Sequence, residues 1–222
     1  MTTLGPDALD LVRRRVVNVV GHELRTPLTT IRGLAELLAD ASEEELHDTL
    51  IPALVRNARR AERLLDDLLI AGEIDTARPV SPAEPVDLSE VVATAVDGTD
   101  VEVEAGGDVP LVLGHRDQIA HAVAHLVENA GQYADAAPVA RFEHDDSTVS
   151  FVLRTPVERA LPPAELELGF ELFFRGEQAV TRAAGLGIGL PVARALARMD
   201  GGDVTIADEA GDVVTRLTLP RT

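Results

Sequence analysis

The sequence predicts an α+β protein in which an antiparallel helical hairpin precedes a domain that combines helices with a mainly antiparallel sheet. Three observations support this prediction. Two long segments with apolar residues at helical spacing come first in the chain. A proline-rich stretch follows them near residue 80. Beyond it, helical patterns are mixed with the alternating patterns of strands.

The composition limits the partners and the location of the protein. The chain has 222 residues and a formal net charge of -18. Nucleic acid is excluded as a direct partner, because phosphate backbones are bound by clustered cations. With no cysteine, the chain has neither a disulfide framework nor a thiolate metal site. No window reaches the roughly 18 apolar residues of a membrane span and no signal peptide is recognised, so we expect a soluble, cytoplasmic protein.

The first two elements are predicted to be long helices. From Pro6 to about Ala39 the apolar residues form one stripe. Ser42 and Glu45 then have the form of a capping box, which starts a second helix running to about Ile74. Because a hairpin cannot bury two such stripes alone, we predict that residues 7–75 form a homodimeric four-helix bundle. The alternative is a hairpin that packs on its own C-terminal domain.

A linker and a second domain follow the hairpin. Prolines among small and acidic residues mark residues 76–85 as the linker, so the hairpin domain covers residues 1–75 and the C-terminal domain covers residues 86–222. Helices and strands alternate irregularly in the C-terminal domain. The predicted helices are residues 87–95, 118–133 and 186–199, residues 164–174 are predicted to be a helix or a helical turn, and the predicted strands are residues 101–104, 148–153, 203–207 and 212–219.

One stretch of the first helix, GHELRTPL at residues 21–28, carries reactive groups. His22 is followed directly by a carboxylate and four residues later by the hydroxyl of Thr26. Pro27 lacks an amide donor and crowds the carbonyl of Glu23, so we expect it to kink or loosen the turn that carries His22. The stretch resembles the H-box of the sensor histidine kinases of two-component signalling, in which the histidine accepts a phosphoryl group.

Three further stretches follow in the order that this family shows. HLVENAGQY at residues 125–133 is similar to the N-box, GFELFFR at residues 169–175 to the aromatic F-box, and AGLGIGL at residues 184–190 to the second glycine box. The resemblance therefore covers almost the whole chain. It implies a HisKA-type dimerisation and phosphoacceptor hairpin, followed by a GHKL-type HATPase domain with the α/β-sandwich (Bergerat-type) fold.

The resemblance also implies the roles of individual residues. His22 would be the nucleophile, and Glu23 would accept its ring proton or fix its tautomer. Thr26 would orient water for dephosphorylating a partner protein. Mg²⁺ on the ATP phosphates would be held by Asn129, because a neutral oxygen ligand suits a hard cation. The residues implied to bind ATP are Asn129, Tyr133, Arg175, Gly185, Gly187 and Gly189.

Parts of the nucleotide site depart from the family pattern. His125 stands where many members have an asparagine, and Gln132 stands where they often have lysine. The first glycine box normally has an aspartate that binds the adenine amino group. That position falls on Thr155 or Pro156, depending on the register, and neither has a carboxylate. Losing a hydrogen bond of roughly 1.5 to 3 kcal/mol would weaken ATP binding about ten- to a hundredfold, so ATP and Mg²⁺ binding is the open part of this prediction.

Three functions are compatible with these motifs. The first is an ATP-dependent autokinase that phosphorylates His22 and passes the phosphoryl group to an aspartate of a response-regulator receiver domain, with phosphatase activity toward that regulator. The second is a degenerate, ATP-independent phosphotransferase or phosphatase that uses His22 and Thr26. The third is a non-catalytic dimeric scaffold. If the protein is a sensor kinase, we expect its sensing part to be missing or to lie on a separate sensor protein.

Overall fold

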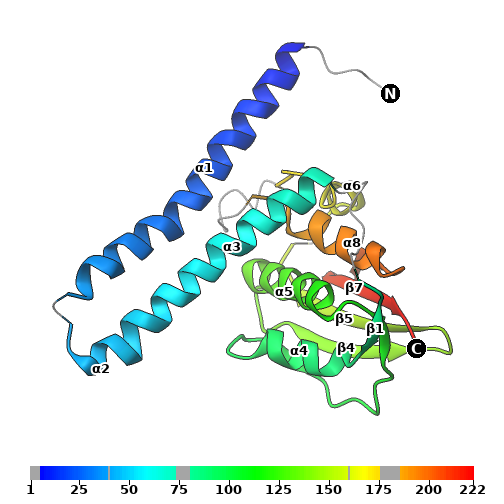
Figure 1. Cartoon of the computed structure of the whole chain (residues 1–222). Helices are drawn as coiled ribbons and strands as arrows, with labels where there is room; N and C mark the ends of the chain where they lie inside the picture. Colours follow the sequence, from blue (N-terminus) through cyan, green and yellow to red (C-terminus); the bar gives the residue numbers. More distant parts are fainter. Residues whose placement is uncertain (1–5, 40, 74–80, 160, 176–185) are drawn as a thin grey trace. The chain divides into compact units, whose positions relative to one another are not determined.

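The computed structural model describes residues 6–39, 41–73, 81–159, 161–175 and 186–222. The chain divides into two compact units, Met1–Leu69 and Ile70–Thr222. The first unit is helical, and the second contains both sheets (Figure 1). Among the helices formed by the described residues, none is both long enough and apolar enough to cross a membrane.

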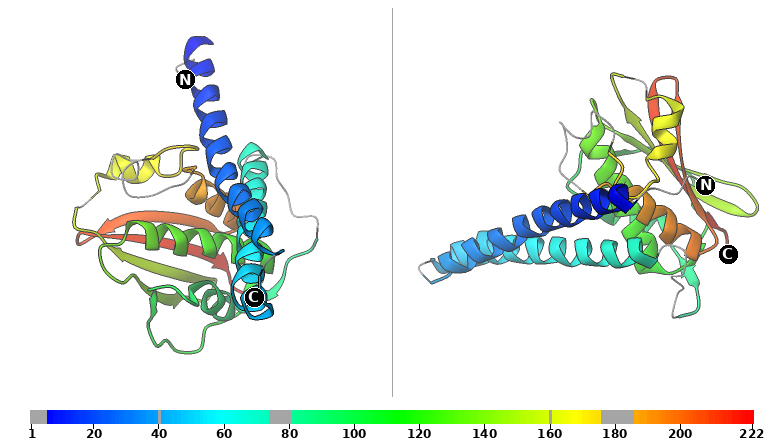
Figure 2. Two further views of the ribbon diagram at one scale, coloured as in Figure 1. Left: turned by 90° about the vertical axis from the view of Figure 1, so that its left-hand side faces the viewer. Right: turned by 90° about the horizontal axis from the view of Figure 1, so that it is seen from above.

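The first unit contains the predicted hairpin. Helix α1 spans Pro6–Leu37, and the second arm begins with the short helix α2 (Glu43–Glu45) and continues in α3 (Ile51–Glu73). Figures 1 and 2 show the two arms running in opposite directions from the turn that joins them and diverging with distance from it. The capping box is confirmed: the Ser42 hydroxyl accepts a hydrogen bond from the Glu45 amide (3.3 Å), and the Glu45 carboxylate accepts one from the Ser42 amide (3.0 Å).

A single π-helical turn, Leu46–Leu50, joins α2 to α3. In this turn the Ile51 amide donates to the carbonyl of Leu46, five residues earlier. The next residue is Pro52, which has no amide to donate and whose ring would crowd the carbonyl of Asp48 in a regular α-helix. The wider π turn relieves this crowding, so Pro52 explains the local change of helix type.

The second unit is built on a five-stranded sheet in the order β2-β4-β5-β7-β6. Only the pair β2–β4 is parallel, so the predicted, mainly antiparallel sheet is confirmed. A separate antiparallel pair joins β1 to β3. The strands are β1 (Glu84–Val86), β2 (Glu102–Val103), β3 (Val112–Gly114), β4 (Val139–His144), β5 (Thr148–Pro156), β6 (Asp203–Glu209) and β7 (Asp212–Pro220).

Helices α4 (Leu88–Val96), α5 (Arg116–Tyr133) and α8 (Gly189–Met199) form a layer over the sheet (Figure 1). Helix α5 packs against α4, α8 and strand β5, which places it at the centre of this layer. The core between helices and sheet consists of fully buried apolar side chains, among them Val123, Leu126, Phe151, Leu153 and Leu217. This packing fixes the orientation of α5, which contains the N-box.

The segment predicted as a helix or helical turn, residues 164–174, contains both a short helix and turns. Helix α6 spans only Pro163–Leu168 and ends at Gly169. Further along, Phe173 has a left-handed backbone with φ of 65°, which a helix cannot accommodate. The F-box is therefore mainly a set of turns after α6.

His115 connects the start of α5 to two other segments of the second unit. Its Nδ1 lies 2.5 Å from a carboxylate oxygen of Asp200, and its Nε2 lies 2.7 Å from the carbonyl oxygen of Ser81. Carboxylate and carbonyl oxygens only accept hydrogen bonds, so both ring nitrogens must donate and the ring must be the protonated imidazolium. The contact with Ser81, followed by that with Asp200, accordingly raises the pKa of His115.

This protonated ring should make the stability of the second unit depend on pH. Because the pKa of His115 is raised above the 6.5 of a free histidine, its contribution is fully present below about 6.5 and is lost as pH rises through the folded-state pKa. We expect the difference in unfolding free energy between wild type and His115→Gln to shrink as pH increases. Urea unfolding at several pH values measures it, with the exposed His144→Gln as control. A difference that stays constant would contradict the imidazolium.

Candidate functional site

The candidate phosphoacceptor lies on an exposed face of α1. His22 and Thr26, one helical turn apart, are both exposed. They line a shallow depression together with Arg25, Thr29 and Thr30. Glu23 is half-buried and, as the next residue along an α-helix, is set about 100° around the axis from His22. The imidazole is thus open to a phosphoryl donor or a partner protein.

Pro27 does not interrupt the helix that carries these residues. Helix α1 is continuous across it, from Pro6 to Leu37. The Thr26 hydroxyl donates to the carbonyl of His22 (3.3 Å), adjacent to the Glu23 carbonyl whose helical amide donor Pro27 removes. The Thr26 side chain is therefore held on the same side of the helix as the imidazole.

The predicted nucleotide residues come from three places in the second unit. Asn129 and Tyr133 lie one turn apart on α5, and both are half-buried. Arg175 is the last residue of the F-box, whereas Gly187 and Gly189 lie just before and at the start of α8. Gly185, also predicted, lies outside the described residues. Two sets of contacts connect these segments.

The first set joins the F-box to the glycine box through the backbone. The Phe173 amide donates to the carbonyl of Gly187 (2.9 Å). Gly187 has a φ of 68°, and a Cβ added there would lie 2.5 Å from the carbonyl oxygen of Phe174. Only glycine fits this position, because any side chain would combine a strained φ with a backbone clash. The predicted helix over residues 186–199 accordingly begins only at Gly189.

The second set joins α5 to the start of α8. A Cβ added at Gly189 would lie 3.2 Å from Nδ1 of His125, so the imidazole lies directly against the first residue of α8. The residue before α8, Ile188, makes no side-chain cap. The first amides of this 11-residue helix are therefore not used by a capping side chain, and such a helix end suits a phosphate group.

Tyr133 and Arg175 bring the end of α5 close to the end of the F-box. Burial raises the pKa of the Tyr133 hydroxyl, and the positive charge of Arg175 opposes that rise. The guanidinium therefore lies near enough to influence the phenol electrostatically. A fixed positive charge beside the glycine box is suited to an anionic ligand.

The adenine end of the site is different. Thr155 is only 4% exposed, and burial alternates at this end of β5, where Leu153 and Thr155 are buried and Arg154 and Pro156 are half-buried. This alternation favours Thr155 over Pro156 as the residue at the aspartate position. The start of α8 therefore suits an anionic group, whereas Thr155 offers a hydroxyl where the family pattern has a carboxylate.

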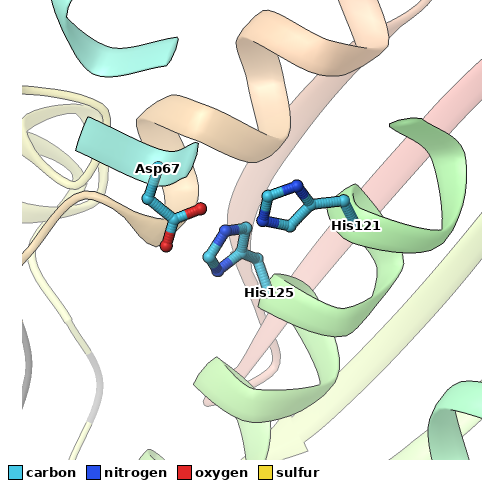
Figure 3. A group of neighbouring side chains, drawn as sticks. All are labelled: Asp67, His121 and His125. Carbon is cyan, nitrogen blue, oxygen red and sulfur yellow. The ribbon is translucent and has the colours of Figure 1, made fainter. Parts of the chain in front are cut away.

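His121 lies outside the motifs recognised in the sequence. This residue lies four positions before His125 on α5, and the two rings stack with centroids 4.9 Å apart and an interplanar angle of 25° (Figure 3). The signal in the sequence is the spacing of two histidines by four within a predicted helix, which places them on one face.

Comparisons with known proteins agree with this architecture. Residues 12–77 match the family of His Kinase A (phospho-acceptor) domains, and residues 114–222 match the family of histidine kinase-, DNA gyrase B- and HSP90-like ATPases. The sensor histidine kinase MtrB of Mycobacterium tuberculosis is 34% identical over 224 residues, covering 94% of this chain and 39% of MtrB. The sensor protein CutS of Streptomyces coelicolor is 32% identical, covering 94% of this chain and 53% of CutS.

A solved structure shows the same fold. The histidine kinase AdeS of Acinetobacter baumannii superposes with a TM-score of 0.59 at 18% identity, covering 90% of this chain and 98% of the AdeS chain. The chain thus spans 39% to 53% of the length of the curated relatives named above. Because residues 12–77 match the phosphoacceptor family, residues 114–222 match the ATPase family, and the chain is 34% identical to MtrB over 94% of its own length, this chain belongs to the sensor histidine kinases of two-component signalling.

Proposed function

We propose that the chain is the catalytic core of an ATP-dependent histidine autokinase. The observation that carries this proposal is the phosphate end of the second unit, where Gly187 is held against the F-box and the start of α8 has no side-chain cap. A packing turn alone would not need both features. The exposed His22 supplies an acceptor of the matching chemistry.

In the proposed reaction a ring nitrogen of His22 attacks the γ-phosphorus of ATP. A phosphorus–nitrogen bond forms, the bond to the bridging oxygen breaks, and ADP leaves with that electron pair. Glu23 holds the proton on the other ring nitrogen and accepts it as the phosphohistidine forms. The products are phosphorylated His22 and ADP.

The residues of the second unit bind and orient the nucleotide. Asn129 would hold Mg²⁺ through its amide oxygen, and the bound ion would neutralise charge on the phosphates. The amides of Gly189 and Leu190 at the start of α8 would donate to a phosphate, and Pro191 contributes no amide. Arg175 adds positive charge beside Tyr133. Positioning and charge neutralisation supply most of the rate in reactions of this kind.

The missing adenine anchor leads to a prediction about affinity. We expect Thr155→Asp to tighten the binding of Mg·ATP about ten- to a hundredfold, since a hydrogen bond to a charged group contributes roughly 1.5 to 3 kcal/mol. Calorimetric titration of wild type and variant measures this. Thr155→Asn adds an uncharged acceptor at the same buried position and should act in the same direction.

The control for this prediction is a nucleotide without the amino group. Inosine triphosphate lacks the donor that the new carboxylate would bind, so the variant should gain no affinity for it. An equal gain for both nucleotides, or no gain for ATP in a folded variant, would mean that Thr155 does not face the adenine. Absence of ATP binding at millimolar concentration in wild type and in both folded variants would refute the autokinase.

The partners follow from the same proposal. His22 would pass its phosphoryl group to an aspartate of a response-regulator receiver domain, and Thr26 would orient water when the regulator is dephosphorylated. Dimerisation through residues 7–75 is supported by apolar side chains of the hairpin that remain exposed. Among them are Leu28 (55% exposed), Leu37 (58%), Leu65 (51%) and Leu69 (68%).

A second candidate function is phosphoryl transfer without ATP. The hydroxyl of Thr155 at the anchor position favours it, because it leaves the adenine end weak while His22 and Thr26 stay intact. Incubating the chain with a phosphorylated regulator and no nucleotide separates the two functions. Transfer to His22 in a chain that binds no ATP would select this candidate, whereas ATP binding with autophosphorylation would select the kinase.

A further inference from the structure

Two histidines on α5 have no part in the proposed kinase reaction. His121 and His125 lie on successive turns of the helix, with their rings stacked and both pointing away from the helix axis to the same side (Figure 3). The ring nitrogens with which they could bind a metal lie within 4.8 Å of one another. Both side chains are half-buried, so neither is a freely moving surface group.

The helix holds this pair in nearly the geometry of a chelate. Two imidazoles that bind one zinc ion with bonds of about 2.0 to 2.1 Å at a tetrahedral angle have nitrogens about 3.3 Å apart. Since the nitrogens of His121 and His125 already lie within 4.8 Å, small rotations of the two rings are sufficient. Helix α5 fixes the backbone over 18 residues, so binding requires no rearrangement of the fold.

Gly189 leaves room for the His125 ring because it has no side chain. A Cβ at Gly189 would lie 3.2 Å from Nδ1 and 3.7 Å from Cγ of this ring, so a larger residue at the start of α8 would displace it. Imidazole nitrogen is a good ligand for zinc, copper and nickel, whereas magnesium prefers oxygen. The pair is therefore chemically different from the magnesium ligand proposed at Asn129.

We propose that His121 and His125 form a binding site for one divalent transition-metal ion of the zinc, nickel and copper class, with water in the remaining positions. The site lies on α5 and needs neither nucleotide nor phosphorylation. The metal-binding proposal can therefore be tested independently of the kinase reaction. Its affinity should follow the order of these metals for imidazole, with copper bound more tightly than nickel or zinc.

Calorimetric titration of the full chain, prepared without a polyhistidine tag, tests the site. With Ni²⁺ we expect one ion per chain. His121→Gln and His125→Gln should each weaken binding at least tenfold, because a single imidazole cannot chelate. His144→Gln removes an exposed histidine from β4 and should leave binding unchanged. Mg²⁺ in large excess should not displace the nickel.

Three results would overturn the proposal: no nickel binding by wild type, unchanged binding by His121→Gln, or equal weakening by His144→Gln. Circular dichroism shows whether each variant is folded. His125 also contacts the start of α8, so His125→Gln could lose stability for a reason unrelated to metal binding. In that case His121→Gln decides, because the three atoms nearest to a Cβ at Gly189 all belong to His125.

Discussion

Replacing His22 by glutamine is expected to abolish phosphoryl transfer to the chain from every donor. Glutamine keeps a polar side chain on the exposed face of α1 but has no nucleophilic nitrogen, so neither ATP nor a phosphorylated regulator can form the phosphorus–nitrogen bond. We expect transfer to fall by at least a thousandfold, to the background of the assay. Label from γ-labelled ATP and from a labelled regulator measures both routes.

Two variants of the hairpin serve as controls for this prediction. His47→Gln removes another exposed histidine of the same hairpin, in the π turn, and should transfer label like wild type. Thr26→Ala removes the hydroxyl that donates to the His22 carbonyl and should keep labelling while slowing dephosphorylation of the regulator. Label that persists in His22→Gln would assign the acceptor to another residue.

Replacing Gly187 by alanine is expected to destabilise the second unit and to remove nucleotide binding. The new Cβ would lie 2.5 Å from the Phe174 carbonyl oxygen, and the residue would keep a φ of 68°. A left-handed φ costs a non-glycine residue about 1 to 2 kcal/mol, and overpacking adds about 1 to 3 kcal/mol. We therefore expect a loss of about 2 to 5 kcal/mol in unfolding free energy, measured by urea unfolding.

Gly98→Ala is the matched control for this change. Gly98 has a similar φ of 72°, but a Cβ there would meet nothing within 4 Å. Gly98→Ala should lower the unfolding free energy only by the cost of the left-handed φ, about 1 to 2 kcal/mol, and should leave nucleotide affinity unchanged. In a Gly187→Ala chain that remains folded, Mg·ATP affinity should fall more than tenfold. Equal effects of the two variants would show that the contact between F-box and glycine box is unimportant.

The sequence predicted the helices of this protein better than its strands. The periodicity of α1 and α5 extends over many turns, so their positions were found to within a few residues. Strands β1 and β3 have three residues each, too few for an alternating pattern. Strand β4 was also missed, because it lies between β2 and β5 and its burial does not alternate cleanly.

The motifs identified the candidate site residues, but not the contacts that hold them. The link between Phe174 and Gly187, and the position of His125 against Gly189, join segments distant in sequence, which local patterns cannot show. The hydrogen bond between His115 and Asp200 could not be predicted for the same reason, since the two residues are 85 positions apart in the sequence. Choosing Thr155 over Pro156 required the burial of β5, because in the sequence the alternation favoured Thr155 whereas the count back from the F-box favoured Pro156.

The most direct test of the central claim is labelling of the wild-type chain with ATP. The chain is incubated with Mg²⁺ and ATP labelled at the γ-phosphate or, in parallel, at the α-phosphate, and the modified peptide is identified. We predict that only the γ-label is incorporated, that it is lost in acid as expected for phosphohistidine, and that it maps to His22 with release of ADP. A chain that binds Mg·ATP in calorimetry but incorporates no γ-label at His22 would contradict the account.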